Sequence, residues 1–214
     1  MQDESNGYFY MLTGQDILIK PLTELYQFFD ANSERNYLSF GKNLMLNPQK
    51  GYLLGLNRSL YYHLFDLLNY RGNMFYRQVE KYLVKAQQFF HIKRKWPFPN
   101  YYQGSGWFFL NRKAVTEIME WLLVNHKVVE YTFAPDEVIF QSILLNSKTD
   151  YHVINDNLRL ILWNNQGKIG SPVILTEQHF AQIKSSHCFF ARKIHPVKSK
   201  RLIELIQNQI FNIE

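Results

Sequence analysis

The apolar positions of the chain alternate between short continuous runs and runs with helical spacing, a pattern typical of an α/β protein. Short runs rich in aromatic and β-branched residues predict strands at 8–12, 36–40, 107–110, 151–154, 157–163 and 187–191. Helical spacing predicts helices at 22–29, 74–92, 111–122, 135–146, from 175 onward after a loop at 167–172, and at 202–213. No repeat or low-complexity linker divides these elements, so we expect a mixed sheet flanked by helices in a single domain, 1–214.

The stretch 104–146 holds the strongest signals for a site. Gly104-Ser105-Gly106 predicts a turn, and the aromatic run that follows predicts a buried strand. Pro135 favours the first turn of a later helix, where the helix dipole also favours the carboxylates of Asp136 and Glu137. Both carboxylates can be ordinary first-turn residues. The alternative is that one of them is a catalytic base.

Charged residues also stand beside three other predicted strands. Asp16 lies in a turn after the first strand, where ligands gather in open α/β sheets, although such a residue can simply cap local N–H groups. Arg192 and Lys193 directly follow an apolar strand that fixes where they point, and the alternative is an edge strand kept soluble by charge. For Arg159 we expect a structural ion pair, with Asp136 as the candidate partner.

Composition narrows the classes of protein. The chain has 214 residues, 46% of them hydrophobic, and a net charge of +6, which suits an anionic ligand. The charge is dispersed and no nucleic-acid reader motif occurs, so we expect no nucleic-acid partner. Cys188 is the single cysteine, which favours a reducing, cytoplasmic compartment. No apolar run approaches the roughly 18 residues of a spanning helix.

A basic run at 91–97 follows the longest predicted helix and contains Trp96. Such a run can touch an anionic lipid surface, so peripheral membrane association is an expectation for this chain. The alternative is that these cations stabilise the negative end of the helix dipole.

The order of these features resembles the Core-2/I-branching enzymes (glycosyltransferase family 14, which also includes the peptide O-xylosyltransferases). Their pattern G-S-x-W, N/T-R, P-D/A-E-x-x-F-Q-T/S-x-L-x-N-S is matched by Gly104, Ser105, Trp107, Asn111, Arg112, Pro135, Glu137, Phe140, Gln141, Leu144, Asn146 and Ser147. The segments LTGQDILIKP around Asp16, NLRLILW at 157–163 and FFARK at 189–193 resemble further family segments. Val173 stands where relatives carry an arginine, so one expected cation is absent there or is supplied by Lys168.

The resemblance implies a GT-A-like (Rossmann-like) fold and an inverting glycosyltransferase. The donor would be a UDP-sugar of the N-acetylglucosamine or xylose type, and the acceptor a hydroxyl of a glycan. No Asp-x-Asp pair occurs in the sequence, so we expect no metal site and no cofactor besides the donor. The resemblance assigns the base to Glu137, donor-phosphate binding to Arg192 and Lys193, and sugar or acceptor binding to Asp16, Ser105, Trp107 and Asp136.

The resemblance also implies an amino-terminal segment that this chain does not contain. Relatives build their first βα units before the strand that corresponds to 8–12, whereas this chain starts almost at that strand. We therefore expect the amino-terminal βα units to be missing and the sheet to be incomplete. The alternative function is a non-catalytic carbohydrate- or partner-binding remnant of such an enzyme.

Overall fold

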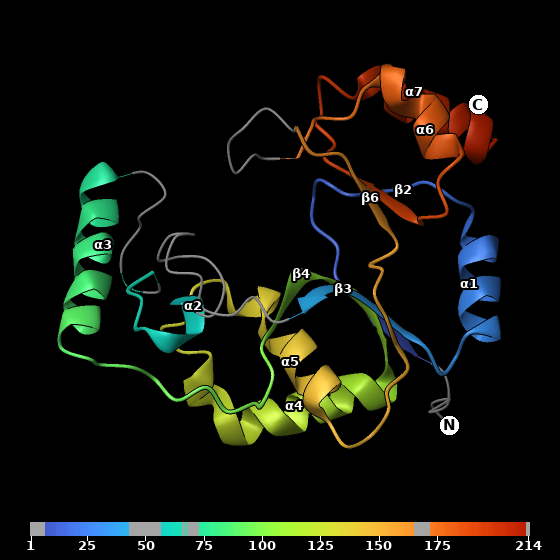
Figure 1. Cartoon of the computed structure of the whole chain (residues 1–214). Helices are drawn as coiled ribbons and strands as arrows, with labels where there is room; N and C mark the ends of the chain where they lie inside the picture. Colours follow the sequence, from blue (N-terminus) through green and yellow to red (C-terminus); the bar gives the residue numbers. More distant parts are fainter. Residues whose placement is uncertain (1–6, 43–56, 66, 68–72, 165–171, 213–214) are drawn as a thin grey trace. The chain divides into compact units, whose positions relative to one another are not determined.

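The computed structural model of the chain describes residues 7–42, 57–65, 67, 73–164 and 172–212 (Figure 1). These residues belong to two compact units. The first unit comprises Met1–Tyr37, Trp107–Arg112 and Ile154–Glu214, and the second comprises Leu38–Gly106 and Lys113–Val153. Except for Pro172, the loop predicted at 167–172 lies outside the described residues.

The described strands form two sheets, and together with the helices they confirm a mixed α/β architecture. One sheet has the order β1-β4-β3-β5, from the strands β1 (Tyr8–Tyr10), β4 (Tyr102–Asn111), β3 (Asn36–Lys42) and β5 (Val153–Ile154). The other has the order β2-β7-β6, from β2 (Ile17–Leu18), β7 (Phe190–Arg192) and β6 (Arg159–Ile161). In the second sheet β2 runs antiparallel to β7 and β6 runs parallel to it, so this sheet is mixed.

The first unit has two apolar cores, which its helices close. Helix α1 (Leu22–Ala31) places Leu25 and Phe29 in a core that is mostly aromatic and also contains Phe109 and Phe189. The second core lies beneath helices α6 (Phe180–Lys184) and α7 (Lys200–Ile210), and it contains Cys188. A short 3-10 helix, η4 (Glu177–His179), precedes α6. Its capping box joins Thr176 to His179.

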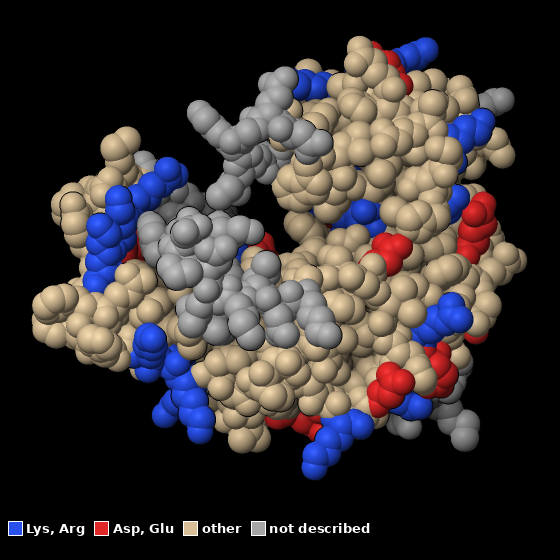
Figure 2. Space-filling view, in the orientation of Figure 1, with Lys and Arg blue, Asp and Glu red and all other residues tan. Residues whose placement is uncertain are grey.

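The second unit is mainly helical. Its described helices are α2 (Asn57–Leu60), α3 (Met74–Phe89), α4 (Arg112–Asn125), η2 (His126–Val128), η3 (Pro135–Glu137) and α5 (Ile139–Asn146). The first residue of α4, Arg112, belongs to the first unit. Helix α3 turns Glu80, Val84 and Gln87 inward. Lysine and arginine side chains gather over α3 on the face seen in Figure 2. Across the described residues, no helix is long and apolar enough to cross a membrane.

The turn predicted at 104–106 is wrong, because these residues lie inside β4. A Cβ atom at Gly104 would overlap the backbone oxygen of Ser39 on the neighbouring strand, and one at Gly106 would lie 2.5 Å from Oδ2 of Asp136. Gly104 therefore allows close packing against β3, and Gly106 leaves room for the Asp136 side chain, so neither glycine serves to reverse the chain.

The helix predicted from Pro135 is interrupted. Residues Pro135–Glu137 form the 3-10 turn η3, and the α-helix α5 begins only at Ile139. The residue before the turn, Ala134, has a left-handed backbone with φ 48°. Asp136 and Glu137 consequently lie in a separate turn ahead of α5, not in its first turn.

Candidate active site

The first unit brings together three charged side chains and one aromatic ring, here called the arginine cluster: Asp16, Trp107, Arg159 and Arg192. Asp16 directly precedes β2, Arg159 begins β6, and Arg192 ends β7. The pairing of these strands sets Ile17 opposite Ala191 and Arg159 opposite Phe190. The small second sheet thus gathers residues that are far apart in the sequence.

Asp16 is enclosed within this cluster. Its Oδ2 accepts hydrogen bonds from the backbone N–H of Thr13 at 2.6 Å and from the Thr13 hydroxyl at 2.9 Å. Its Oδ1 lies 3.2 Å from Nε of Arg159 and 3.7 Å from Nη1 of Arg192, and the carboxylate side chain is 1% exposed. The Arg159 contact is an ion pair without hydrogen-bond alignment. The structural ion pair expected for Arg159 is therefore present, but its partner is Asp16 and not Asp136.

Trp107 packs its ring against both guanidinium groups. The Cζ atom of Arg192 lies 4.1 Å from the ring centroid, and that of Arg159 lies 5.3 Å away. Cations are attracted to the negative face of an indole ring, and this contact holds planar guanidinium groups in place. Burial lowers the pKa of Arg159 from 12.5 to about 10, Asp16 opposes this shift, and Arg192 adds to it. Even so, Arg159 keeps its charge at neutral pH.

The arginine cluster holds more positive than negative charge. Two guanidinium groups face the single carboxylate of Asp16, which leaves one buried positive charge in excess. Among the described residues, Nη1 of Arg159 and Nε of Arg192 have no hydrogen-bond partner. Buried cations without a full set of acceptors are costly, and an anionic ligand would supply what is missing. The chemistry of this cluster therefore suits an anion such as a phosphate.

Lys193 follows Arg192 directly and is half-buried. Its backbone is fixed, because its N–H donates to the carbonyl of Val173 at 3.4 Å and its carbonyl accepts from Leu175 at 2.9 Å. Within the described part of the chain, its ammonium group forms no ion pair with a carboxylate. Lys193 thus adds a second cation next to the end of β7.

The second unit holds Glu137, in a setting that the sequence did not reveal. Nη1 of Arg58 contacts Oε2 of Glu137 at 2.5 Å, and the Glu137 side chain is 40% exposed while that of Arg58 is only 6% exposed. The Arg58 guanidinium also lies 5.2 Å from the ring centroid of Phe133. The buried arginine therefore holds a carboxylate that solvent, and hence a hydroxyl group, can reach.

Local sequence does not link Arg58 to Glu137, because 79 positions separate the two residues. The chain brings them together through backbone contacts. The Phe133 N–H donates to the Arg58 carbonyl at 3.0 Å, one residue before the left-handed turn at Ala134. The Glu137 N–H then donates to the carbonyl of Ala134 at 3.1 Å, which closes the turn that presents the carboxylate.

Two further predicted site residues also lie in the second unit. Nε2 of Gln141 donates to the backbone carbonyl of Ser105 at 2.7 Å, and so joins α5 to β4. The carboxylate of Asp136 lies against Gly106 of the same strand. Ser105 and Asp136 are thus associated with one segment of β4, and Glu137 follows Asp136 in η3. Asp16, Trp107, Arg192 and Lys193 belong to the first unit.

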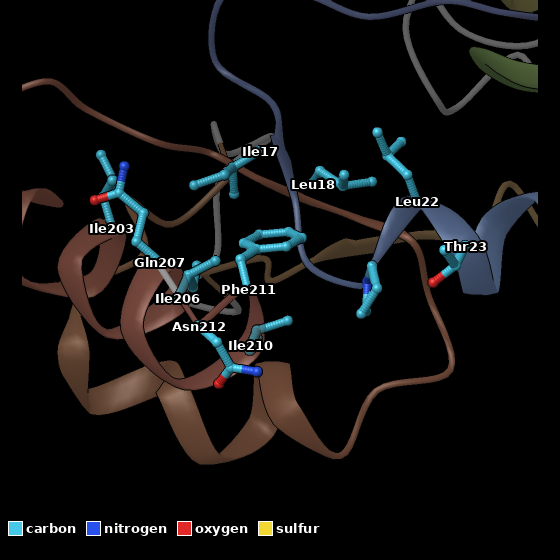
Figure 3. A pocket seen from close by; sticks show the side chains of 11 residues that line it. Ile17, Leu18, Leu22, Thr23, Ile203, Ile206, Gln207, Ile210, Phe211 and Asn212 are labelled. Atoms are coloured by element: carbon cyan, nitrogen blue, oxygen red, sulfur yellow. The ribbon is translucent and has the colours of Figure 1, made fainter. Parts of the chain in front are cut away.

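A separate pocket of about 620 Å³ lies in the first unit, between the start of α1 and the end of α7. Figure 3 shows that Ile17, Leu18 and Leu22 face Ile206, Ile210 and Phe211 across it, with Thr23, Gln207 and Asn212 as its polar side chains. No charged residue lines the pocket, and none of the predicted site residues does either. It is therefore unsuited to a diphosphate. The described residues also contain no group of three or more His, Cys, Asp or Glu residues that could hold a metal ion.

Comparison with known proteins agrees with the sequence pattern. The family model of the Core-2/I-branching enzyme matches residues 1–184, a range that includes Glu137 and ends before Arg192 and Lys193. Xylosyltransferase 1 from Rattus norvegicus is 27% identical over 128 residues, which cover 50% of this chain and 15% of that protein. The chain thus matches only a small part of that relative. The family match extends over most of the chain, and the chain therefore belongs to the Core-2/I-branching enzymes, a family of glycosyltransferases.

Proposed function

We propose that this chain is an inverting, metal-independent glycosyltransferase with a GT-A-like fold. It moves a sugar of the N-acetylglucosamine or xylose type from a UDP-sugar to a hydroxyl of a glycan. The observation that carries the proposal is the excess positive charge of the arginine cluster, with guanidinium N–H groups that have no acceptor among the described residues. A departing nucleoside diphosphate carries the opposite charge.

Sugar transfer needs a base for the acceptor hydroxyl and positive charge for the departing diphosphate. The acceptor hydroxyl attacks the anomeric carbon and gives its proton to the carboxylate of Glu137. The bond between the anomeric carbon and the diphosphate breaks on the opposite face, and the electron pair leaves with the diphosphate oxygen. Arg192 and Lys193 stabilise that oxygen, arginine through its planar fork and lysine as a compact charge.

The other predicted residues take binding roles. Ser105, Trp107 and Asp136 keep sugar or acceptor binding as their proposed role. The sequence predicts the same role for Asp16. In the described structure its carboxylate is directed at Arg159 and Arg192. In this proposal Asp16 therefore acts on the donor indirectly, by orienting Arg192.

Binding of UDP tests the role of the cation pair. We expect calorimetry in the presence of a chelator to detect UDP binding to the wild-type chain. Each of the variants Arg192→Ala and Lys193→Ala should weaken it by roughly 10- to 100-fold, the usual effect of losing one charge-assisted hydrogen bond. Lys200→Ala is the matched control, because Lys200 is an exposed cation on α7 and should have no effect.

Turnover tests the base. UDP release from UDP-N-acetylglucosamine or UDP-xylose should fall by about 100-fold or more in Glu137→Gln, since general bases contribute about this much. UDP affinity should stay unchanged, and Glu130→Gln, an exposed residue of the same unit, should keep normal turnover. Normal turnover of Glu137→Gln would show that the base is another residue. Loss of activity on chelation would show that a metal is required.

The alternative function gives a different result in the same experiments. A non-catalytic remnant binds a glycan or a protein partner and shows no calorimetric signal with UDP. That outcome would remove the enzyme assignment for this chain while leaving its family unchanged.

A further inference from the structure

Helix α3 exposes a line of aromatic rings that its packing does not use. Phe75, Tyr82 and Phe89 are spaced seven residues apart, so they lie along one side of the helix. Their exposed fractions are 68%, 65% and 77%, and Met74 next to them is 78% exposed. Large apolar side chains gathered at such exposure mark a surface that another body covers.

Lysines accompany this aromatic line. Lys81 and Lys85 are exposed and four residues apart, and Nζ of Lys85 lies 6.0 Å from the ring centroid of Tyr82. Lys93 and Lys95 are exposed just beyond the helix. Figure 2 shows this gathering of basic side chains over α3. The outer side of the segment therefore combines rings with positive charge.

The segment 73–95 contains one carboxylate, and that carboxylate points inward. Glu80 is 2% exposed, and its Oε1 lies 2.7 Å from Nδ1 of His63. Its Oε2 accepts the backbone N–H of Leu64 at 3.1 Å. The exposed side thus contains no negative charge of its own to balance the lysines.

The inner side fixes which way the rings face. Besides Glu80, Gln87 bonds both backbone groups of Tyr62, accepting from its N–H at 2.8 Å and donating to its carbonyl at 2.9 Å. These polar bonds are directional, so the helix cannot rotate to bury its rings without breaking them. The exposure of Phe75, Tyr82 and Phe89 is therefore built into the attachment of α3.

We propose that this outer face of α3, called the α3 face and defined by Met74, Phe75, Lys81, Tyr82, Lys85 and Phe89, binds the surface of an anionic lipid bilayer. Aromatic rings enter the headgroup region, and lysines pair with lipid phosphates at the same depth. Charge complementarity selects this partner: the face carries cations without anions, as expected for an amphipathic helix that lies on an anionic membrane. This surface holds the chain at a membrane. The proposal does not depend on the glycosyltransferase activity proposed above.

Vesicle co-sedimentation of the full chain tests the proposal. We expect binding to vesicles of phosphatidylcholine mixed with phosphatidylglycerol, weaker binding at high salt, and little binding to phosphatidylcholine alone. The paired variant Lys81→Gln and Lys85→Gln should weaken binding by roughly 25-fold, because each lysine near an anionic surface contributes about fivefold. The triple variant Phe75→Ser, Tyr82→Ser and Phe89→Ser should abolish binding and keep the protein folded, since the replaced rings are exposed.

Two control variants distinguish binding through the α3 face from non-specific adsorption to vesicles. The triple variant Met119→Ser, Leu123→Ser and Val124→Ser removes apolar side chains of α4 that are 54%, 75% and 80% exposed, next to the exposed Glu120. The paired variant Lys198→Gln and Lys200→Gln removes the same charge elsewhere. Both should bind anionic vesicles like the wild type.

Three outcomes would overturn the proposal. The first is equal binding to neutral and anionic vesicles. The second is no binding to either, and the third is equal loss of binding in the α4 control. A dimer in sedimentation velocity that the aromatic triple variant dissociates would assign the α3 face to a second copy of the chain instead of a bilayer.

Discussion

Asp16 illustrates what is decided at the scale of single residues. Its place after a predicted strand indicates a position where ligands gather, which remains a prediction, and charged groups surround it in the structure. Which groups these are depends on strand pairing, and Arg159 and Arg192 come from β6 and β7, far along the sequence. The same limit explains why the Arg159 partner was predicted as Asp136 and why Arg58 was not linked to Glu137. Local sequence indicates which charged residues are candidates for a site, but it does not indicate which distant residues they pair with.

Replacing Asp16 by asparagine should destabilise the protein strongly. The change leaves two buried guanidinium groups without their carboxylate, and breaking a buried ion pair in this way costs about 3–5 kcal/mol. Urea unfolding followed by circular dichroism measures the difference. Asp30→Asn, at an exposed position of α1, is the control and should change the free energy of unfolding by less than about 0.5 kcal/mol. Equal stability of the two variants would show that the arginine cluster does not need this charge.

At the scale of elements, the spacing of apolar residues predicts the long helices well. It does not predict where glycine or proline makes the backbone depart from a regular pattern. Helix α1 was expected at 22–29 and spans Leu22–Ala31, and α3 was expected at 74–92 and spans Met74–Phe89. The errors fell at glycine and proline. Gly104 was interpreted as a turn residue, although it is there to allow close approach of β3. The helix expected at Pro135 splits into η3 and α5 at Val138, whose φ of −134° departs from helical values.

The close approach at Gly104 predicts a steep cost for any side chain. Gly104→Ala places a methyl group on the backbone oxygen of Ser39, so β3 and β4 must move apart. We expect a loss of about 1–3 kcal/mol or more in the free energy of unfolding, as for other overpacked sites. Gly41→Ala is the matched control in the paired strand, because its Cβ would lie 3.6 Å from the carbonyl of Gln103, an ordinary contact. Thermal unfolding of both variants would show a lower midpoint for Gly104→Ala alone.

At the scale of the whole molecule, the two units are not marked in the sequence. The chain passes between the units after Tyr37, Gly106, Arg112 and Val153, which lie inside β3, β4, α4 and β5. Gly104-Ser105-Gly106 stands at one of these boundaries, but it is part of β4 and not of a linker. Composition therefore indicated no division, and the prediction of a single domain remains a prediction.

Both units contain a tyrosine that should make the protein sensitive to alkali. Burial is the main cause that raises the pKa of Tyr8 in the first unit and of Tyr101 in the second from 10.0 to about 12. Between these two values the unfolded chain releases a proton that the folded chain retains, so the stabilisation that each tyrosine contributes is present below pH 10 and is lost as the pH rises above it.

For Tyr101, which is 5% exposed, the expected loss is about 1 kcal/mol between pH 10 and 11. Urea midpoints measured at a series of pH values should show this decline, and Tyr101→Phe should make it less steep, because the contribution of Tyr8 remains. A wild-type midpoint that stays constant up to pH 11 would contradict the prediction.

Cys188 gives this chain a reporter of its own. The thiol lies in the core beneath α6 and α7, it is 5% exposed, and burial raises its pKa. A thiol reagent should therefore modify the native protein only as fast as the first unit opens. Because the sequence contains no second cysteine, labelling kinetics would follow the opening of that unit alone, without any engineered label.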